Sequence, residues 1–377
     1  MKLSVRTLGG EEVATLAAEP AWTLADVCSR LGDAAPAPGL RARIFCGTLE
    51  LTPGESFASI GIHEGSQLTL VVSAALLALS ASYDSTAKLW NADSGECLHT
   101  FAGHSKPVLS AAFSPDGASV LTASRDATAR LWSARSGECL QTFQGHEYPV
   151  CSAAFSPDGA LVLTASRDAT AVLWSLQSGE CLQTFRSRGF PMHSAALSPD
   201  GASALTASDD GAARLWSVQS GECLRSFRGH ERPAYSATFS PDGSSALTSS
   251  NDGTARLWCA RSGECRRVFR GHRAPVFSAV FSPDGASLVT ASEDGTARLW
   301  SAQSGECLQT FEGHEHAVCS ATFASDGASV LTASLDATAR LWSTQSGECL
   351  RTLRGHEDGL ASAVFSPSCV QVTAAEK

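Results

Sequence analysis

The sequence predicts a mainly β protein in two parts: a closed ring of seven four-stranded antiparallel sheets and, before it, a small α+β domain. Three observations lead to this fold class. Tryptophan recurs seven times at a spacing of 42 residues, from Trp90 to Trp342. Four short strand-like runs, separated by tight-turn residues, fill each interval. Residues 1–72 carry none of the repeated text, so they are expected to fold separately.

One interval shows how a sheet is predicted. Residues 145–185 read GHEYPVCSAAFSPDGALVLTASRDATAVLWSLQSGECLQTF, in which the runs VCSAAF, LVLTAS, TAVLW and CLQTF are separated by Pro-Asp-Gly, Asp-Ala and Ser-Gly-Glu. Alternating and β-branched residues favour strands, and clusters of Gly, Pro and Asp favour reversals. A single four-stranded meander exposes both faces. Stacking seven of them in a closed ring buries these faces and leaves only short edges.

These repeats resemble the WD40 β-propeller family from Ala74 to the C-terminus. The resemblance rests on Gly-His pairs, on Ser-Pro-Asp-Gly and on an aspartate six residues before each tryptophan. One departure is uniform, because the aspartate that usually follows the tryptophan is replaced by Asn91, by Ser133 and its equivalents, or by Cys259. The resemblance implies a seven-bladed propeller.

The resemblance also implies a structural tetrad in each blade, where a buried indole N–H and an imidazole find a hydroxyl and a carboxylate as partners. It maps onto His104, Ser124, Asp126 and Trp132. The same residues recur as His146, Ser166, Asp168, Trp174; His230, Ser250, Asp252, Trp258; His272, Ser292, Asp294, Trp300; and His314, Ser334, Asp336, Trp342. A buried polar group without a partner costs about 1–3 kcal/mol. These histidines and aspartates are therefore expected to be structural rather than catalytic.

The repeat that ends at Trp216 departs from this rule. Ser187 and Arg188 stand where Gly-His is expected, although Ser208 and Asp210 remain. Without the imidazole, this blade is expected to be locally the least stable. Two interpretations stay open: drift in one tolerated copy, or a site remodelled for a partner.

The two ends of the repeat array complement each other. Ser82, Asp84 and Trp90 have no Gly-His before them, whereas His356 has no aspartate and tryptophan after it. We therefore predict that residues 74–377 form the propeller and that His356 completes the tetrad of the first blade.

Closure of the ring then depends on the last strand of the chain. The run from about Leu360 to Phe365 is predicted to become the inner strand of the first blade. A rival hypothesis remains, since Val71 lies 42 residues before Phe113 and its strand fits the same place.

Residues 1–73 are predicted to form the separate small domain. MKLSVRTLGG, then ARIFCGTLEL, then ASIGIHEGSQLTLVV resemble ubiquitin in order and spacing. The residues agree with a β-grasp arrangement, with an alternating hairpin, a helix over residues 23–31 and then short strands. Thr23 is the expected N-cap of this helix, with Asp26 in the capping-box position.

The resemblance to ubiquitin implies a recognition patch but no conjugation. The patch maps onto Leu8, Ile44 and Val71, and apolar residues clustered on a sheet face are what a helical binding element packs against. The alternative is that these are ordinary sheet residues. Conjugation needs a free Gly-Gly end, whereas Val72 continues directly into Ser73.

Positions that vary between otherwise near-identical repeats indicate a binding surface, because the scaffold is constant. By the geometry of the resembled family, these positions face the top of the ring around the channel. Tyrosine and arginine concentrate binding energy in interfaces. The predicted partner-binding residues are Tyr83, Arg125, Tyr148, Arg167, Phe190, His193, Tyr235 and Phe277. Relaxed drift at exposed loop positions is the alternative.

Charge and motifs limit the classes of function. A formal net charge of -10 argues against a nucleic-acid-binding role. The apolar run Leu68–Leu79 is too short to span a membrane, and four lysines provide no polybasic anchor.

Seven cysteines at the repeat spacing are interpreted as free thiols, and no secretory signal is recognised, so we expect the cytosol or nucleus. Phosphate-loop, zinc and nucleophile-elbow motifs are not found, so neither catalysis nor a metal or cofactor is expected.

The predicted function is a non-catalytic scaffold. The top of the propeller is expected to bind a protein partner, and the ubiquitin-like domain to engage ubiquitin receptors or proteasome components. An alternative is a resemblance to Notchless-type ribosome-assembly factors, whose ubiquitin-like domain docks on a remodelling ATPase. A third hypothesis, an enzyme, has no recognisable residues to support it.

Overall fold

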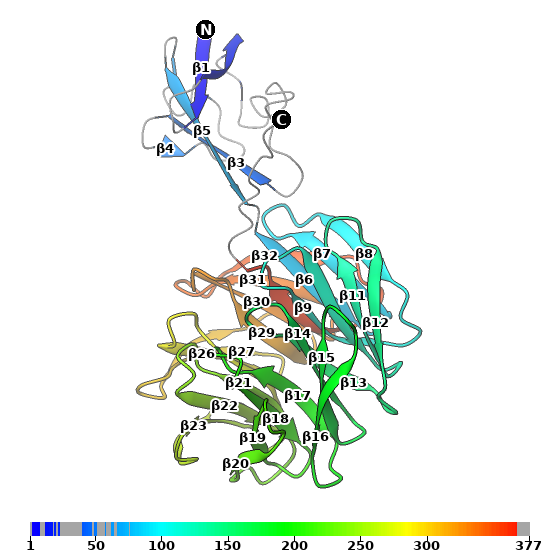
Figure 1. Ribbon diagram of the computed structural model, residues 1–377. Helices are drawn as coiled ribbons and strands as arrows, with labels where there is room; N and C mark the ends of the chain where they lie inside the picture. The colour runs from blue at the N-terminus through cyan, green and yellow to red at the C-terminus, as the bar shows by residue number, and fades with distance from the viewer. Residues whose placement is uncertain are drawn as a thin grey trace. The chain divides into compact units, whose positions relative to one another are not determined.

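The computed structural model describes residues 2–7, 12–17, 19, 22, 40–46, 49–50, 57, 62–63, 66–74 and 76–367. The chain divides into two compact units with the boundary between Ala75 and Leu76. The larger unit contains seven four-stranded sheets (Figure 1). Their inner strands contact one another in the order β33, β9, β13, β17, β21, β25 and β29, and β29 contacts β33 again. The predicted seven-bladed, mainly β propeller is therefore confirmed.

Blade 3 illustrates the sheet that each repeat forms. Its strands are β13 (Val150–Phe155), β14 (Leu161–Ser166), β15 (Thr170–Ser175) and β16 (Cys181–Arg186), paired antiparallel in chain order. β14 is almost wholly buried because neighbouring blades cover both of its faces, whereas β16 forms the largely exposed outer edge.

The other blades follow the same plan. Blade 2 has β9 (Val108–Phe113), β10 (Ser119–Ser124), β11 (Thr128–Ser133) and β12 (Cys139–Gln144); blade 4 has β17 (Met192–Leu197), β18 (Ser203–Ser208), β19 (Ala213–Ser217) and β20 (Cys223–Phe227). Blade 5 has β21 (Ala234–Phe239), β22 (Ser245–Ser250), β23 (Thr254–Cys259) and β24 (Cys265–Arg270); blade 6 has β25 (Val276–Phe281), β26 (Ser287–Ser292), β27 (Ala297–Ser301) and β28 (Cys307–Phe311). Blade 7 has β29 (Val318–Phe323), β30 (Ser329–Ser334), β31 (Thr338–Ser343) and β32 (Cys349–Arg354).

Blade 1 combines the two ends of the array. β6 (Leu77–Ser82), β7 (Thr86–Asn91) and β8 (Cys97–Ala102) come from the start, and β33 (Leu360–Phe365) comes from the end. β33 pairs antiparallel with β6, from Leu360 opposite Ser82 to Phe365 opposite Ala78. The inner position is thus held by β33 and not by the strand that contains Val71, which belongs to another sheet.

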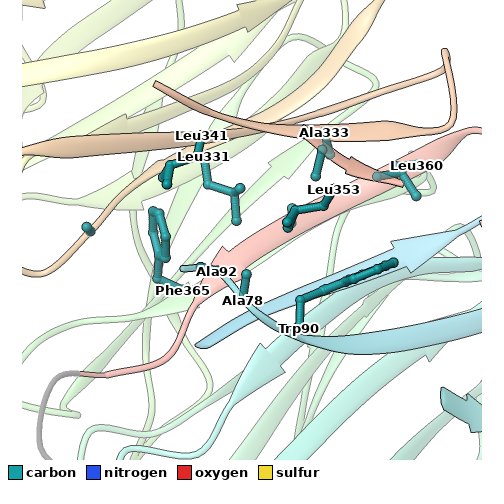
Figure 2. Packing of buried hydrophobic residues seen from close by; sticks show 12 residues of the cluster. Ala78, Trp90, Ala92, Leu331, Ala333, Leu341, Leu353, Leu360 and Phe365 are labelled. Carbon is teal, nitrogen blue, oxygen red and sulfur yellow. The ribbon is translucent and has the colours of Figure 1, made fainter. Parts of the chain in front are cut away.

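The hydrophobic core lies between adjacent blades. Figure 2 shows the cluster where blade 7 meets blade 1, in which Leu341 lies on the side of Phe365 and Leu353 on the side of Trp90. All four are at most 9% exposed. Removing a buried aromatic of this size costs about 3–5 kcal/mol. The recurring tryptophan therefore holds neighbouring blades together, which accounts for its strict period.

The Ser-Pro-Asp-Gly motif builds the turn between the first two strands of a blade. In blade 3, Ser156 Oγ donates to Asp158 Oδ1 at 2.5 Å, and the same oxygen accepts from Ala160 N at 3.0 Å. Gly159 has φ of 73°, a left-handed conformation that glycine adopts without strain. The motif is thus explained by local structure.

Among the described residues, the smaller unit contains one sheet. Its strands are β1 (Lys2–Thr7), β2 (Glu12–Ala17), β3 (Leu40–Cys46), β4 (Leu49–Glu50) and β5 (Gln67–Ala74). They lie in the order β2-β1-β5-β3-β4, and only the β1–β5 pair is parallel. Val5 and Leu68 are paired and fully buried. The helix predicted over residues 23–31 lies outside the described residues.

Candidate functional site

One end of the ring, called the mouth below, is formed in every blade by two segments. The turn after the second strand lies against the loop that enters the first strand. In blade 2, Arg125 N donates to Pro107 O at 2.9 Å, and Ser105 N donates to Asp126 Oδ2 at 3.2 Å. The predicted partner-binding residues lie on these segments or on the inner strands beside them.

Arg125 and Tyr83 bring blades 2 and 1 together at the mouth. The guanidinium of Arg125 lies 5.1 Å from the centroid of the Tyr83 ring, a cation–π contact. Burial raises the pKa of Tyr83, and Arg125 and Arg167 partly oppose this. Burial likewise raises the pKa of the Cys151 thiol, with Arg167 opposing, so this thiol is neutral at pH 7.

A second group runs across blades 4, 5 and 6. The rings of His193 and Tyr235 meet edge to face with centroids 5.3 Å apart, and Tyr235 lies 5.5 Å from Phe277. His193 Nε2 contacts Asp209 Oδ1 at 2.5 Å. Burial raises the pKa of Tyr235, and the carboxylates of Asp209 and Glu293 raise it further.

Tyr148 and Phe190 stand apart from both groups. They lie on the loops that enter blades 3 and 4, and they are 59% and 43% exposed. Within residues 76–367, no aromatic contact joins either ring to another. The mouth therefore offers two exposed aromatic rings in addition to the packed ones.

Beneath the mouth, each tetrad is a chain of buried hydrogen bonds. In blade 2, His104 Nδ1 contacts Asp126 Oδ2 at 2.7 Å, and His104 Nε2 contacts Thr122 Oγ1 at 2.8 Å. Trp132 Nε1 donates to the same Thr122 oxygen at 2.8 Å. Burial lowers the pKa of His104, although Asp126 opposes this. A neutral imidazole with its proton on Nδ1 satisfies all of these partners.

The hydroxyl of the tetrad differs from the sequence prediction. Thr122, and not Ser124, bridges the imidazole and the indole. Ser124 Oγ instead donates to Lys106 O at 2.9 Å and accepts from Asp126 N at 3.1 Å. Ser124 thus joins the entering loop to the turn. Thr122, two residues earlier in β10, lies beside the buried rings of His104 and Trp132. The corresponding residues in later blades are Thr164, Thr206, Thr248, Thr290 and Thr332.

Blade 1 has the same arrangement, completed by the end of the array. His356 Nδ1 contacts Asp84 Oδ2 at 2.6 Å, and its Nε2 contacts Ser80 Oγ at 2.7 Å. Trp90 Nε1 donates to Ser80 Oγ at 2.8 Å. The hydroxyl of this tetrad is therefore Ser80, whereas Ser82 donates to the carbonyl of Gly359 at 3.0 Å.

Comparison with known families now identifies the repeat. The family model described as WD domain, G-beta repeat, matches residues 95–133, 137–175, 179–217, 221–259, 263–301 and 305–343, more than half of the chain. The chain belongs to the WD40 repeat family. Each matched segment runs from the turn before one outer strand to the tryptophan strand of the next blade.

Curated relatives match this WD40 protein over about one repeat. F-box-like/WD repeat-containing protein TBL1X of Mus musculus is 52% identical over 42 residues, which are 11% of this chain and 8% of the relative. WD40 repeat-containing protein HOS15 of Arabidopsis thaliana is 60% identical over 38 residues, 10% of this chain and 6% of the relative. WD repeat-containing protein 25 of Mus musculus is 54% identical over 44 residues, which are 11% of this chain and 8% of the relative. The chain thus spans under a tenth of the length of these relatives.

In blade 4 of the WD40 propeller, the role of the loop histidine is taken by an arginine from a strand, Arg214 of β19. Arg214 of β19 forms a buried ion pair with Asp210, and its Nη1 donates to Ser208 Oγ at 2.8 Å. Trp216 Nε1 still donates to Thr206 Oγ1 at 2.9 Å. In blade 2 the corresponding Arg130 lies over the tryptophan ring, 6.0 Å from its centroid.

Two further changes accompany this exchange. Ala212 stands where the other blades have a threonine that donates to the tetrad aspartate, as Thr128 donates to Asp126 at 2.6 Å. Arg188, at the position of the missing histidine, is exposed. Sequence reasoning missed Arg214, and the signal available for it was the joint loss of histidine and threonine in one repeat.

The predicted ubiquitin-like patch is only partly within the described residues. Leu8 lies outside them. Ile44 is paired with Leu70, and Val71 with Arg43, on successive rungs of the β3–β5 ladder. The patch therefore stays a prediction.

Other kinds of site can be stated only for the described part of the chain. There, no three His, Cys, Asp or Glu side chains cluster as metal ligands do. In the same ranges, no helix has the length and apolar character to cross a membrane. The repeated cysteines begin the outer strands and are exposed: Cys97, Cys139, Cys181, Cys223, Cys265, Cys307 and Cys349.

Proposed function

We propose that this WD40 propeller is a non-catalytic scaffold that binds a protein partner at its mouth. The observation that carries the proposal is the contrast between constant and variable positions. The tetrads are hydrogen-bonded within each blade, whereas the variable positions place exposed Tyr148, Phe190, Arg125 and Arg167 at one end of the ring. Aromatic and arginine side chains are the residues that anchor protein interfaces.

The test is affinity capture of binding proteins by the full chain, followed by quantitative mass spectrometry. Tyr148→Ala with Phe190→Ala is expected to lose the specific partners. The control variant is Leu140→Ala with Leu182→Ala, which removes apolar side chains of similar exposure, 56% and 53%, from outer strands. Partners lost from the control and kept by the mouth variant would place the interface on the outer strands and overturn the proposal.

For residues 1–73 we propose a ubiquitin-like domain that engages ubiquitin receptors or proteasome components. The motifs quoted from residues 1–10, 42–51 and 58–72 support this, and a parallel β1–β5 pair is what a β-grasp sheet requires. Ile44→Ala in the full chain is expected to abolish co-sedimentation with proteasomes. Co-sedimentation with pre-ribosomal particles instead would support the role of a ribosome-assembly factor.

A further inference from the structure

Charge is unevenly distributed around the mouth. Every blade has one tetrad aspartate, so these carboxylates do not distinguish one blade from another. Each is held by a histidine or, in blade 4, by Arg214. The difference therefore comes from the variable turns and loops. Blades 2, 3 and 4 carry the exposed cations Lys106, Arg125, Arg167 and Arg188. With the exposed rings of Tyr148 and Phe190, these residues are called the basic sector.

The remaining blades carry the opposite charge. Besides the tetrad aspartates, their turns and loops contain six acids and three arginines: Glu231, Glu293, Glu312, Glu315, Glu357 and Asp358, with Arg228, Arg232 and Arg273. A hollow of about 590 Å³ beside blades 6 and 7 is lined by Glu293, Glu315 and His316. A protein of net charge -10 thus concentrates positive charge in one part of its mouth.

The arginines of the basic sector are not neutralised within the protein. Among the described residues, neither Arg125 nor Arg167 forms an ion pair; Arg125 lies on the Tyr83 ring, and Arg167 lies near the neutral Cys151 thiol. Besides the tetrad aspartates, the turns and loops of blades 2, 3 and 4 contain two acids, Glu147 and Asp209. Asp209 is held by His193 at 2.5 Å, which leaves Glu147. A planar guanidinium binds a carboxylate through two parallel hydrogen bonds, so free arginines suit carboxylate ligands.

The substituted tetrad of blade 4 adds to this sector. The histidine that normally occupies the position of Arg188 is buried in other blades, as for His146, whose side chain is 3% exposed. Because Arg214 takes over the bond to Asp210, Arg188 is released to solvent. Two residues further on, Phe190 is 43% exposed. The same loop thus gains a cation and an apolar ring.

We propose that the basic sector binds an acidic segment of a protein partner, with carboxylates on Arg125, Arg167 and Arg188 and an apolar side chain on Tyr148 or Phe190. This rests on the proposed function, since it names the chemistry of the partner at the mouth. A polynucleotide is disfavoured because its phosphates require denser cations and the whole chain is acidic.

The experiment selects displayed random peptides on the immobilised full chain. Enriched peptides are expected to contain an excess of Asp and Glu together with an apolar residue. Each is then synthesised, and its affinity is measured for the full chain, for Arg125→Glu with Arg167→Glu, and for Arg232→Glu with Arg273→Glu. The two variants change the charge equally, but on opposite sides of the mouth. The first is expected to weaken binding at least about tenfold and the second less than about twofold.

The outcomes separate the two proposals. Enriched peptides without an acidic excess, or with equal affinity for both variants, would overturn the acidic partner while leaving the mouth as a binding surface. If no peptide is enriched, both proposals fail. A labelled oligothymidine that binds the full chain and loses binding with Arg125→Glu and Arg167→Glu would replace the protein partner with a nucleic acid.

Discussion

Arg214 forms an ion pair with Asp210 inside blade 4, at the place where the other blades join a histidine to an aspartate. Arg214 is 4% exposed and also donates to Ser208. Removing one partner of a buried ion pair leaves the other charge uncompensated, which costs about 3–5 kcal/mol. We therefore expect Arg214→Ala to open β18 and β19 locally, measured as faster amide hydrogen exchange in those strands.

The matched control is Arg256→Ala in blade 5. Arg256 occupies the corresponding position, but there His230 contacts the aspartate, so the expected loss is below about 1.5 kcal/mol. Restoring a tetrad in blade 4 with Ser187→Gly, Arg188→His and Ala212→Thr is expected to make Arg214→Ala tolerable. Equal losses in blades 4 and 5 would show that the ion pair has no special role.

The hydrogen bond of the Trp132 indole N–H is expected to depend on Thr122 and not on Ser124. Thr122→Val keeps the shape but leaves Trp132 Nε1 and His104 Nε2 without partners, each costing about 1–3 kcal/mol. Ser124→Ala removes the bond to Lys106 O and keeps the indole bond. The measurement is the indole N–H chemical shift of Trp132 by NMR. A shift moved by Ser124→Ala and unmoved by Thr122→Val would return the role to Ser124.

Closure of the ring by β33 is expected to protect blade 1. A chain that ends at Gly355 loses the strand paired with β6, together with Leu360 and Phe365 of the cluster in Figure 2. Because each blade is held by its neighbours, amides of β6 and β7 are expected to exchange quickly while those of β14 and β15 stay protected. Adding a peptide of residues 356–367 is expected to restore protection. Unchanged exchange in β6 would contradict this role of β33.

The ring was predictable because an unbroken 42-residue period places one tryptophan in every blade. The residue that supplies the tetrad hydroxyl was not predictable in this way. Thr122 and Ser124 are two residues apart, so alternation puts both on one face of the strand. Both also recur in almost every repeat. Only the pairing of β10 with β11 decides which of them reaches the indole.

The ion pair of Arg214 within blade 4 and the contacts between blades were also not predicted from the sequence. Arg214 did not look unusual, since arginine occupies this position in most repeats. Its role follows from two substitutions earlier in the same repeat, Arg188 in place of the histidine and Ala212 in place of the threonine. The aromatic contact of Tyr235 with Phe277 and the stacking of Arg125 on Tyr83 depend on how closely neighbouring blades approach, and no pattern within one repeat encodes that distance.

Two cysteines are expected to differ sharply in reactivity. Hydrogen bonds from Ser262 lower the pKa of Cys259 to about 7, whereas burial raises the pKa of Cys319 to about 12. Because the thiolate is the nucleophile, iodoacetamide at neutral pH is expected to label Cys259 rapidly and Cys319 only when blade 7 opens. The readout is mass spectrometry of the labelled peptides. Similar rates at the two sites in the folded protein would contradict the assignment.

Acidification is expected to destabilise the propeller first through its histidines. Burial lowers the pKa of His104, His314 and His356, although the tetrad aspartates oppose this. The unfolded chain then binds protons near its ordinary pKa of about 6.5 that the native protein does not, so stability falls as pH drops below about 7. The measurement is the urea midpoint against pH. A midpoint that stays constant down to about pH 5 would contradict the neutral imidazoles.

A second loss is expected at lower pH from the aspartates. Burial acts to raise the pKa of Asp168, but hydrogen bonds from His146 and Thr170 outweigh it and hold the pKa at about 2. A carboxylate with a lowered folded pKa stabilises the protein above its unfolded pKa, about 4, and this contribution is lost as pH falls toward the folded value. Asp168→Asn is the control. It removes the titrating group, so the decline of the urea midpoint below about pH 4 is expected to become shallower in this variant.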